Sequence, residues 1–246
     1  MSWDNEATAA YIRANVPAGS WSATFWTRFE ALPAGSFILG GLGGAAATLA
    51  SQILFRADQY RTVHNTAEGT SLFDPATATW YYGFLAFNSL GAGASTLTLK
   101  YLADGGGTFL ATQQATGLTA LAWTHMLLGT HTSAIANNQD MVMASAKFYD
   151  GVISDANALS ERSYTRNQTG AELATYDFLD GALTTDRSVN AYTLTLVGTG
   201  GAYIADKPTD LTIGTAATGR IMGSLAGPGG LAGPGGLAGR YGGLAG

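Results

Sequence analysis

The sequence predicts an all-β protein: an antiparallel, two-sheet β-sandwich of the jelly-roll kind, with one short helix and an extended, glycine-rich C-terminal tail. Short runs rich in Thr and aromatic residues recur over residues 1–213, and turn residues separate them. Strands do not alternate with long helices, which argues against a parallel sheet. From residue 223 onward the composition changes to a repeat of Gly, Pro, Leu and Ala. We therefore expect a sandwich domain over 1–222 and a tail over 223–246.

The N-terminal part of the chain contains the first predicted strands. Residues 4–14 predict either a short helix or the first edge strand, and residues 21–29 predict a strand rich in aromatic residues. Two further strands, 36–41 and 47–56, are expected to form a hairpin around a glycine turn. Residues 57–78 are polar and typical of a loop.

The glycine hairpin has an alternative interpretation as a membrane-crossing helix. Residues 37–55 are mostly apolar or small, and their number is sufficient to cross a bilayer. Gly40-Gly41 and Gly43-Gly44 would each weaken such a helix by about 1 kcal/mol per residue. We therefore expect a hairpin and no membrane span.

A central strand and a second hairpin follow. Residues 79–88 are apolar on both faces, as expected of a central strand in a sandwich. Residues 96–113 predict a hairpin that turns at residues 104–107. Its first strand should have one apolar face and one polar face. The apolar face contains Leu97, Leu99 and Tyr101, and the polar face contains Thr96, Thr98 and Lys100.

The stretch from residue 123 to residue 164 predicts two strands and the short helix. The strands are 123–128 and 141–149, and Asp150-Gly151 ends the second one. Ser154 is expected to cap a short surface helix that starts at Asp155. Late strands are expected at 174–180, at 190–197 and within 204–213.

Several of these segments together resemble the concanavalin A-like lectin/glucanase superfamily, and most of all its laminin-G and pentraxin-like domains. The resemblance lies in a Trp-x-His strand at 123–125, in Lys-Phe-Tyr-Asp-Gly at 147–151 and in Val-Ile-Ser-Asp-Ala-Asn-Ala-Leu at 152–159. Residues 21–29 are similar to an early strand of the family, and residues 176–188 to its closing strands. The resemblance implies a jelly-roll sandwich. The resemblance does not indicate one particular function, because the superfamily contains hydrolases, sugar-binding proteins and scaffolds.

No catalytic residue or metal site is predicted. The family's glucanases use a Glu-x-Asp-x-x-Glu strand motif, which is absent from this sequence, and the five Glu residues are isolated. We therefore expect a protein that is not an enzyme and has no cofactor. Some family members bind calcium through loop carboxylates. Asp104, Asp150 and Asp155 are the candidates for such a role, but each also fits a turn or a helix cap.

Aromatic residues provide the candidates for glycan binding, which needs exposed rings beside polar groups. Trp80 and Tyr82 are expected on one face of the central strand and Tyr81 on the other, and Tyr101 is the fourth candidate. The alternative is that both faces of this strand belong to the core.

Charge and cysteine content exclude other functions. The net charge is −5 and no basic run occurs, so a nucleic-acid partner is not expected. The chain has no Cys, which excludes disulfide and thiolate chemistry. The N-terminus lacks a basic segment followed by an apolar one, so no signal peptide is expected.

The repeat in the C-terminal tail predicts that this segment mediates assembly with copies of itself or with another partner. Gly recurs at every third position from 227 to 242, which favours an extended helix with three residues per turn. Such a helix has no internal hydrogen bonds, so it needs copies of itself or another partner to order it; the alternative is a flexible linker. The residues expected to mediate assembly are Leu225, Pro228, Leu231, Gly233, Pro234, Leu237 and Tyr241.

These features together predict a non-catalytic structural or adhesive component of a larger particle. The most concrete form is a bacteriophage fibre, spike or capsid-decoration protein on the virion surface. It would assemble as a trimer or another homo-oligomer, or with other virion proteins through its tail. The alternative is a secreted or cell-surface carbohydrate-binding module whose partners are glycans.

Overall fold

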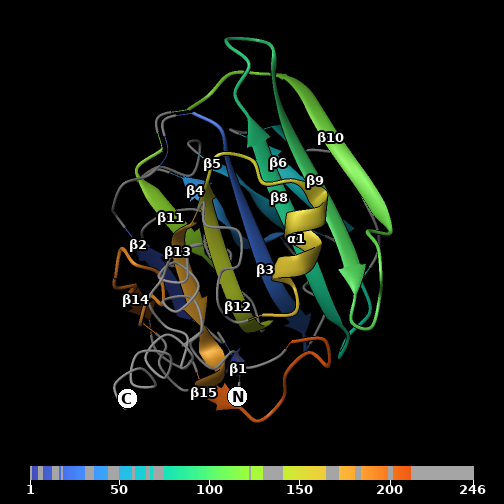
Figure 1. The fold of residues 1–246 in the computed structure, drawn as a ribbon, viewed down its shortest axis with the longest axis vertical. Coiled ribbons are helices and arrows are strands. Elements are labelled where there is room, and N and C mark those ends of the chain that lie inside the picture. The colour runs from blue at the N-terminus through green and yellow to red at the C-terminus, as the bar shows by residue number, and fades with distance from the viewer. Residues whose placement is uncertain are drawn as a thin grey trace, which may run out of the picture. The chain divides into compact units, whose positions relative to one another are not determined.

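The computed structural model describes most of the first 211 residues (Figure 1). The chain divides into a unit of residues 1–213 and a unit of residues 214–246, and the second unit contains no described residue. The predicted tail and its boundary at residue 222 therefore lie outside the described residues. The described residues are 2–4, 8–12, 17, 19–30, 36–43, 50–56, 59–64, 67–68, 75–121, 123–129, 141–164, 172–180, 184–198 and 202–211.

The fold is an antiparallel β-sandwich with one short helix, as the sequence predicted. One layer, here called sheet A, has eight strands in the described part of the chain. All its strand pairs are antiparallel. The strand order is β10 (Ala111–Leu118), β9 (Ser95–Ala103), β8 (Trp80–Asn88), β3 (Trp21–Phe29), β12 (Met141–Asp150), β1 (Ser2–Asp4) and β15 (Ala202–Ile204), and β13 (Glu172–Asp177) also pairs with β12.

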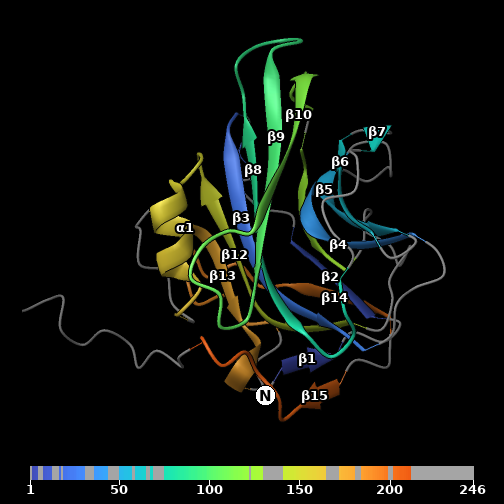
Figure 2. The same ribbon diagram turned by 90° about the vertical axis from the view of Figure 1, so that its right-hand side faces the viewer.

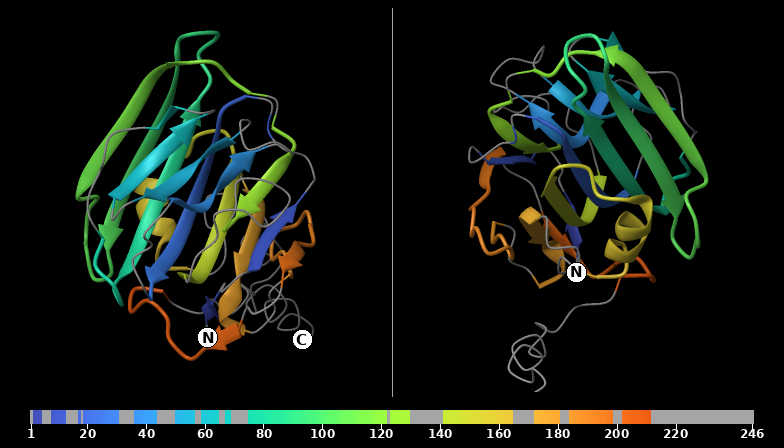
Figure 3. Two further views of the ribbon diagram at one scale, coloured as in Figure 1. Left: turned by 180° about the vertical axis from the view of Figure 1, so that it is seen from behind. Right: turned by 45° about the horizontal axis from the view of Figure 1, so that its top comes forward.

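The second layer, here called sheet B, has seven strands in the described residues and faces sheet A (Figure 2). Figure 3 shows its central strands from the side opposite to Figure 1. Its order is β14 (Thr195–Gly198), β2 (Thr8–Ile12), β11 (His125–Leu128), β4 (Ser36–Gly43), β5 (Ala50–Arg56), β6 (Gln59–His64) and β7 (Ala67–Glu68).

Several expected elements differ from the observed ones. The segment 4–14 contributes the end of β1 and all of β2, so its helical alternative is wrong. The segment expected to be a loop, 57–78, contains β6 and β7, which extend sheet B beyond β5. Both strands contain polar residues, and backbone pairing rather than an apolar pattern places them in the sheet: β6 pairs with β5, and β7 pairs with β6. The segment 174–180 ends in a 3₁₀ turn, η1 (Phe178–Asp180), and not in a strand.

The glycine-rich segment forms the expected hairpin of β4 and β5. The two strands pair from Ser36 opposite Arg56 to Gly43 opposite Ala50. Gly40 is required here because a Cβ atom would lie 2.9 Å from Cε1 of Phe25 and 3.0 Å from the carbonyl oxygen of Leu127. Across the described residues, no helix has the length and apolar character needed to cross a membrane.

The main core lies between the two sheets, as the predicted strand alternation requires. Trp123 belongs to it and packs edge-to-face on Trp21 and Phe87 at centroid distances of 6.2 and 5.7 Å. His64 of sheet B stacks on Phe87 of sheet A at 5.4 Å, so aromatic contacts join the layers. His125 is fully buried within sheet B. The larger members of this core are Trp21, Phe25, Phe29, Leu85, Phe87, Leu97, Leu99, Trp123, Met126, Phe148 and Tyr176.

Candidate ligand-binding surface

The outer face of sheet A, which points away from sheet B, is covered over part of its width by the helix α1 (Asp155–Glu161) (Figure 1). The predicted cap is present, because the Ser154 side chain accepts a hydrogen bond from the Asn157 amide at 3.2 Å. Beneath the helix and its flanking loops lies a second layer of apolar packing. Its main members are Trp26, Trp80, Tyr82, Phe84, Leu102, Val142, Tyr149 and Ile153.

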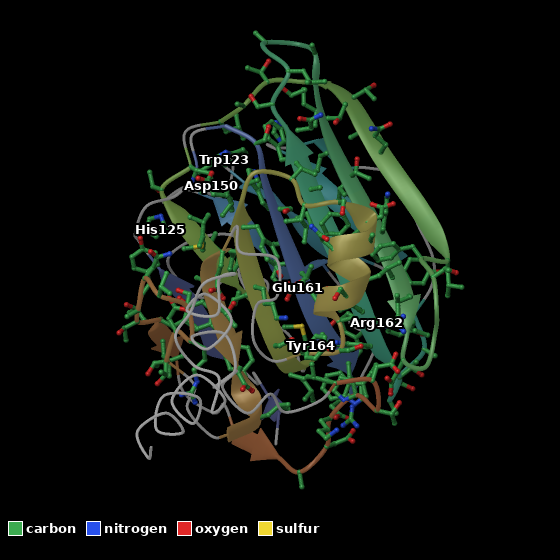
Figure 4. The ribbon with its side chains drawn as sticks, viewed as in Figure 1. Trp123, His125, Asp150, Glu161, Arg162 and Tyr164 are labelled. Atoms are coloured by element: carbon green, nitrogen blue, oxygen red, sulfur yellow. The ribbon has the colours of Figure 1, made fainter. Side chains whose placement is uncertain are left out.

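The C-terminal end of α1 is tied to the sheet by side chains that donate to helix carbonyl oxygens. The last carbonyls of a helix have no partner within it, so they need donors from elsewhere. Figure 4 shows Glu161 and Arg162 at this end of the helix. The three bonds are Tyr82 Oη to Ala158 O at 2.7 Å, Trp26 Nε1 to Arg162 O at 2.7 Å and Lys147 Nζ to Glu161 O at 2.9 Å.

A buried ion pair strengthens the same attachment. Lys147 Nζ lies 2.7 Å from Glu161 Oε2, and the two side chains are 1% and 0% exposed. Burial lowers the pKa of Lys147, and the adjacent Glu161 carboxylate opposes that shift. The ammonium group also carries positive charge at the C-terminus of a helix, where it is favourable. Because both groups are inaccessible to solvent, we interpret the pair as structural.

Two of the predicted glycan-binding residues, Trp80 and Tyr82, lie in this covered layer. The Trp80 indole donates to Asp206 Oδ2 at 3.2 Å, and the Arg28 guanidinium lies over its ring at 5.5 Å. Tyr82 is 1% exposed and packs on Trp26. Neither ring presents an open face for stacking on a sugar.

The other two, Tyr81 and Tyr101, lie on the inner face of sheet A. Their rings pack on each other at 6.3 Å, and Tyr81 Oη accepts a hydrogen bond from the Ala76 amide at 2.9 Å. The two side chains are 7% and 9% exposed. Burial, and next the neighbouring Tyr81, raises the pKa of Tyr101. The structure thus divides the four candidates between two buried faces, which is the alternative that the sequence left open.

The exposed part of the outer face lies over β9 and β10, beyond α1. Thr96 and Thr98 alternate with fully buried Leu97 and Leu99, as the sequence predicted. On β10, Gln114 lies opposite Thr98 and its amide donates to the Thr98 hydroxyl at 3.5 Å. We call this area the Thr–Gln surface. It consists of Thr96, Thr98, Gln114 and Thr116, of which the last two are the most exposed.

The border between α1 and the Thr–Gln surface carries a charged pair and an apolar platform. Lys100 of β9 pairs with Asp155 in the first turn of the helix. Lys100 Nζ also lies 6.0 Å from the ring centroid of Phe109, which stacks on Phe84 at 6.0 Å. Leu110 beside it is 63% exposed. Sequence reasoning missed Phe109, because a single aromatic residue after a glycine turn has no periodic pattern to indicate its position.

We compared the sequence and the fold of this chain with those of known proteins. Neither a family model nor a curated protein matches the sequence. A solved structure of a proposed carbohydrate-binding protein from Bacteroides ovatus is similar over 83% of this chain and 61% of its own, with 12% identity and a TM-score of 0.53. The two proteins share a β-sandwich fold. At this identity the likeness concerns the fold alone.

Two other matches are weaker. A Trypanosoma rangeli sialidase in complex with sialic acid is 14% identical, covers 58% of this chain and has a TM-score of 0.43. The chain spans only 22% of that sialidase. The binding domain of botulinum neurotoxin serotype C1 is 13% identical over 63% of this chain and 40% of its own, with a TM-score of 0.39. TM-scores this low carry no information about the function of this chain.

The candidate calcium-binding carboxylates do not form one cluster in the described part of the sandwich. Asp104 accepts hydrogen bonds from the Thr209 amide and hydroxyl at 2.7 and 2.9 Å and from the Asp210 amide at 3.1 Å. It therefore ties the β9–β10 turn to the segment after β15. Asp155 is the partner of Lys100, and Asp150 is exposed at the end of β12. Within the described ranges, no three His, Cys, Asp or Glu side chains form a group suited to a metal ion.

Asp186 is a structural carboxylate that sequence reasoning did not single out. Its Oδ1 accepts from the amides of Thr175 and Ser188, both at 2.8 Å. Its Oδ2 accepts from the Ser188 hydroxyl at 2.7 Å and from the Tyr192 amide at 2.8 Å. This carboxylate holds the loop 184–192 against β13.

Proposed function

We propose that this protein is a non-catalytic carbohydrate-binding module and that the Thr–Gln surface is its binding site. The observation that carries the proposal is the contrast within one sheet face. Under α1 the face is covered and apolar, whereas over β9 and β10 it presents hydroxyl and amide groups to solvent. The similarity of fold to a proposed carbohydrate-binding protein supports this choice over a purely structural role.

The chemistry of the surface suits a sugar. Thr hydroxyls both donate and accept hydrogen bonds, and the Gln114 amide does the same through two different atoms, which matches the mixed donors and acceptors of a sugar ring. Phe109 and Leu110 provide an adjacent apolar platform for the C–H face of a sugar. The nearest charges, Lys100 and Asp155, neutralise each other. Neutral glycans are therefore the expected ligands.

The double variant Thr98→Val/Gln114→Leu should weaken glycan binding by about tenfold, because two hydrogen-bonding groups of about 0.5–1.5 kcal/mol each are lost. The measurement is a glycan array followed by calorimetry with the best neutral oligosaccharide. Thr195→Val, an exposed threonine on sheet B, is the matched control and should bind as the unmodified protein does.

Absence of binding by the unmodified protein, or an equal loss in the Thr195→Val control, would exclude the Thr–Gln surface as the site. The oligosaccharide should also be recovered intact after incubation. Release of reducing sugar that is abolished by changing a single Asp or Glu would contradict the non-catalytic assignment.

A second proposal is an adhesive or structural role within a larger particle, such as a phage fibre or decoration protein. It is supported by the Gly-Pro-Gly-Gly-Leu-Ala repeat of the tail, which lies outside the described residues. In an extended helix with three residues per turn, Leu225, Leu231 and Leu237 would form one stripe that needs a neighbour.

Removal of residues 223–246 should leave the melting temperature of the sandwich unchanged and reduce the size of any assembly, because the tail adds little apolar mass to the core. Light scattering on the full chain and on 1–222 makes the comparison. Changing Leu225, Leu231 and Leu237 to Ser should reproduce the effect without shortening the chain. If the truncated protein keeps the same oligomeric state, the tail does not drive assembly.

A further inference from the structure

Lys100 lies on the same face of sheet A as the Thr–Gln surface. Successive residues of a strand point to opposite faces, so Lys100 shares the outer face of β9 with Thr96 and Thr98. Across the strand pair, Thr112 is the residue opposite Lys100, and Gln114 is the residue opposite Thr98. A glycan that covers the Thr98–Gln114 pair and extends along β9 in one direction therefore reaches Lys100 next.

Lys100 is already engaged by the carboxylate of Asp155. Its ammonium group pairs with Asp155 Oδ2 and lies 6.0 Å from the ring centroid of Phe109. The Lys100 side chain is 19% exposed, whereas the Asp155 side chain is 54% exposed. The pair therefore does not present its two charges equally, because the carboxylate is the more accessible of them. A ligand that approaches this border meets negative charge first.

The position of Asp155 is fixed by the helix that carries it. Asp155 is the first residue of α1, and the Ser154 side chain before it caps the helix by accepting from the Asn157 amide at 3.2 Å. At the other end, the buried Lys147–Glu161 pair holds α1 on the sheet. The carboxylate is therefore held close to Lys100 before any ligand binds, so no further ordering is needed for it to act on a ligand. The net charge of −5 acts in the same direction.

We infer that Asp155 is a specificity-determining residue of the glycan-binding site, and that it selects against sugars that carry a carboxylate. This inference rests on the proposed function and assigns a residue to the choice between neutral and acidic glycans. An acidic sugar at this border lies beside a second negative charge, and it gains Lys100 only by displacing Asp155. A neutral sugar meets neither obstacle. Removal of the Asp155 charge should therefore release Lys100 to pair with the sugar carboxylate.

The test compares one neutral oligosaccharide with its acidic counterpart. The neutral probe is the oligosaccharide that the unmodified protein binds most tightly on the array, and the acidic probe is the same compound with its C6 hydroxymethyl groups oxidised to carboxylates. Calorimetry on the full chain gives the dissociation constant of each, and the unmodified protein should prefer the neutral probe. Asp155→Asn should bind the acidic probe about fivefold more tightly, which is the size expected of an exposed charge pair. Its affinity for the neutral probe should stay the same.

Two further variants separate the role of Asp155 from a general effect of charge. Asp150→Asn removes one negative charge from the exposed end of β12, which β3 and β8 separate from β9 in the sheet, and should leave both dissociation constants unchanged. Lys100→Met/Asp155→Asn should lose most of the gain for the acidic probe, because the cation that binds the carboxylate is gone. The gain in Asp155→Asn should also vanish in about 1 M salt, where exposed charges are screened beyond about 3 Å.

Equal affinities of Asp155→Asn and the unmodified protein for the acidic probe, or an equal gain in Asp150→Asn, overturn the inference. A preference of the unmodified protein for the acidic probe overturns it as well. In these cases carbohydrate binding itself stands, because a sugar is still bound. If no neutral oligosaccharide binds, the proposed function and the inference fall together. Circular dichroism of each variant verifies that the fold is retained.

Discussion

The variant Lys147→Met should lose about 3–5 kcal/mol of unfolding free energy, because it leaves a buried carboxylate without its cation. Glu161 is fully buried, so water cannot replace the lost ammonium group. The same substitution removes the donor to the Glu161 carbonyl oxygen, so this end of α1 loses that hydrogen bond to the sheet together with the ion pair. Chemical denaturation monitored by circular dichroism measures the loss.

The double variant Lys147→Met/Glu161→Leu is the control. Replacing both members of a buried ion pair with apolar residues of similar volume is often neutral, so the double variant should recover most of the lost stability. If Lys147→Met unfolds at the same denaturant concentration as the unmodified protein, the ion pair does not hold α1 on the sheet.

Trp123→Ala should cost a similar amount, about 3–5 kcal/mol, through a different mechanism. The substitution opens a cavity where four aromatic rings meet between the two sheets. Those rings belong to Trp21, His64, Phe87 and Trp123 itself, with centroid distances from Trp123 of 5.7 to 6.2 Å. The melting temperature and the denaturant midpoint should therefore both fall.

Trp123→Phe distinguishes packing from hydrogen bonding. Among the described residues, Trp123 Nε1 is buried without a hydrogen-bond partner, so Phe gives up no hydrogen bond and should cost much less than Ala. Equal losses in the two variants would show that the indole ring itself, and not filled volume, stabilises the site. An unchanged melting temperature for Trp123→Ala would contradict its place in the core.

The features predicted correctly from sequence are those set by near neighbours in the chain. Successive side chains of a strand point to opposite faces, so the polar row of Thr96 and Thr98 was predictable beside Leu97 and Leu99. The cap at Ser154 likewise depends on an amide three residues away. Half of the proposed site, its strand β9, was therefore visible in the sequence.

Whether a face is covered was decided only by tertiary structure. Trp80 and Tyr82 are aromatic residues of the kind that bind sugars when they are exposed. In the structure, α1 and the segment after β15 lie over them. The bonds responsible join residues far apart in the chain: Tyr82 and Ala158 are separated by 76 positions, and Trp26 and Arg162 by 136. Such contacts depend on how the whole chain packs, and strand periodicity carries no information about them.

The sequence alone thus determined the all-β class, the strand faces and the capped helix, because each follows from local backbone geometry. Tertiary structure decided which aromatic residues are buried, where Phe109 lies and that Lys147 meets Glu161. Burial and pairing are properties of the packed molecule, and they determine which surface remains accessible to a ligand.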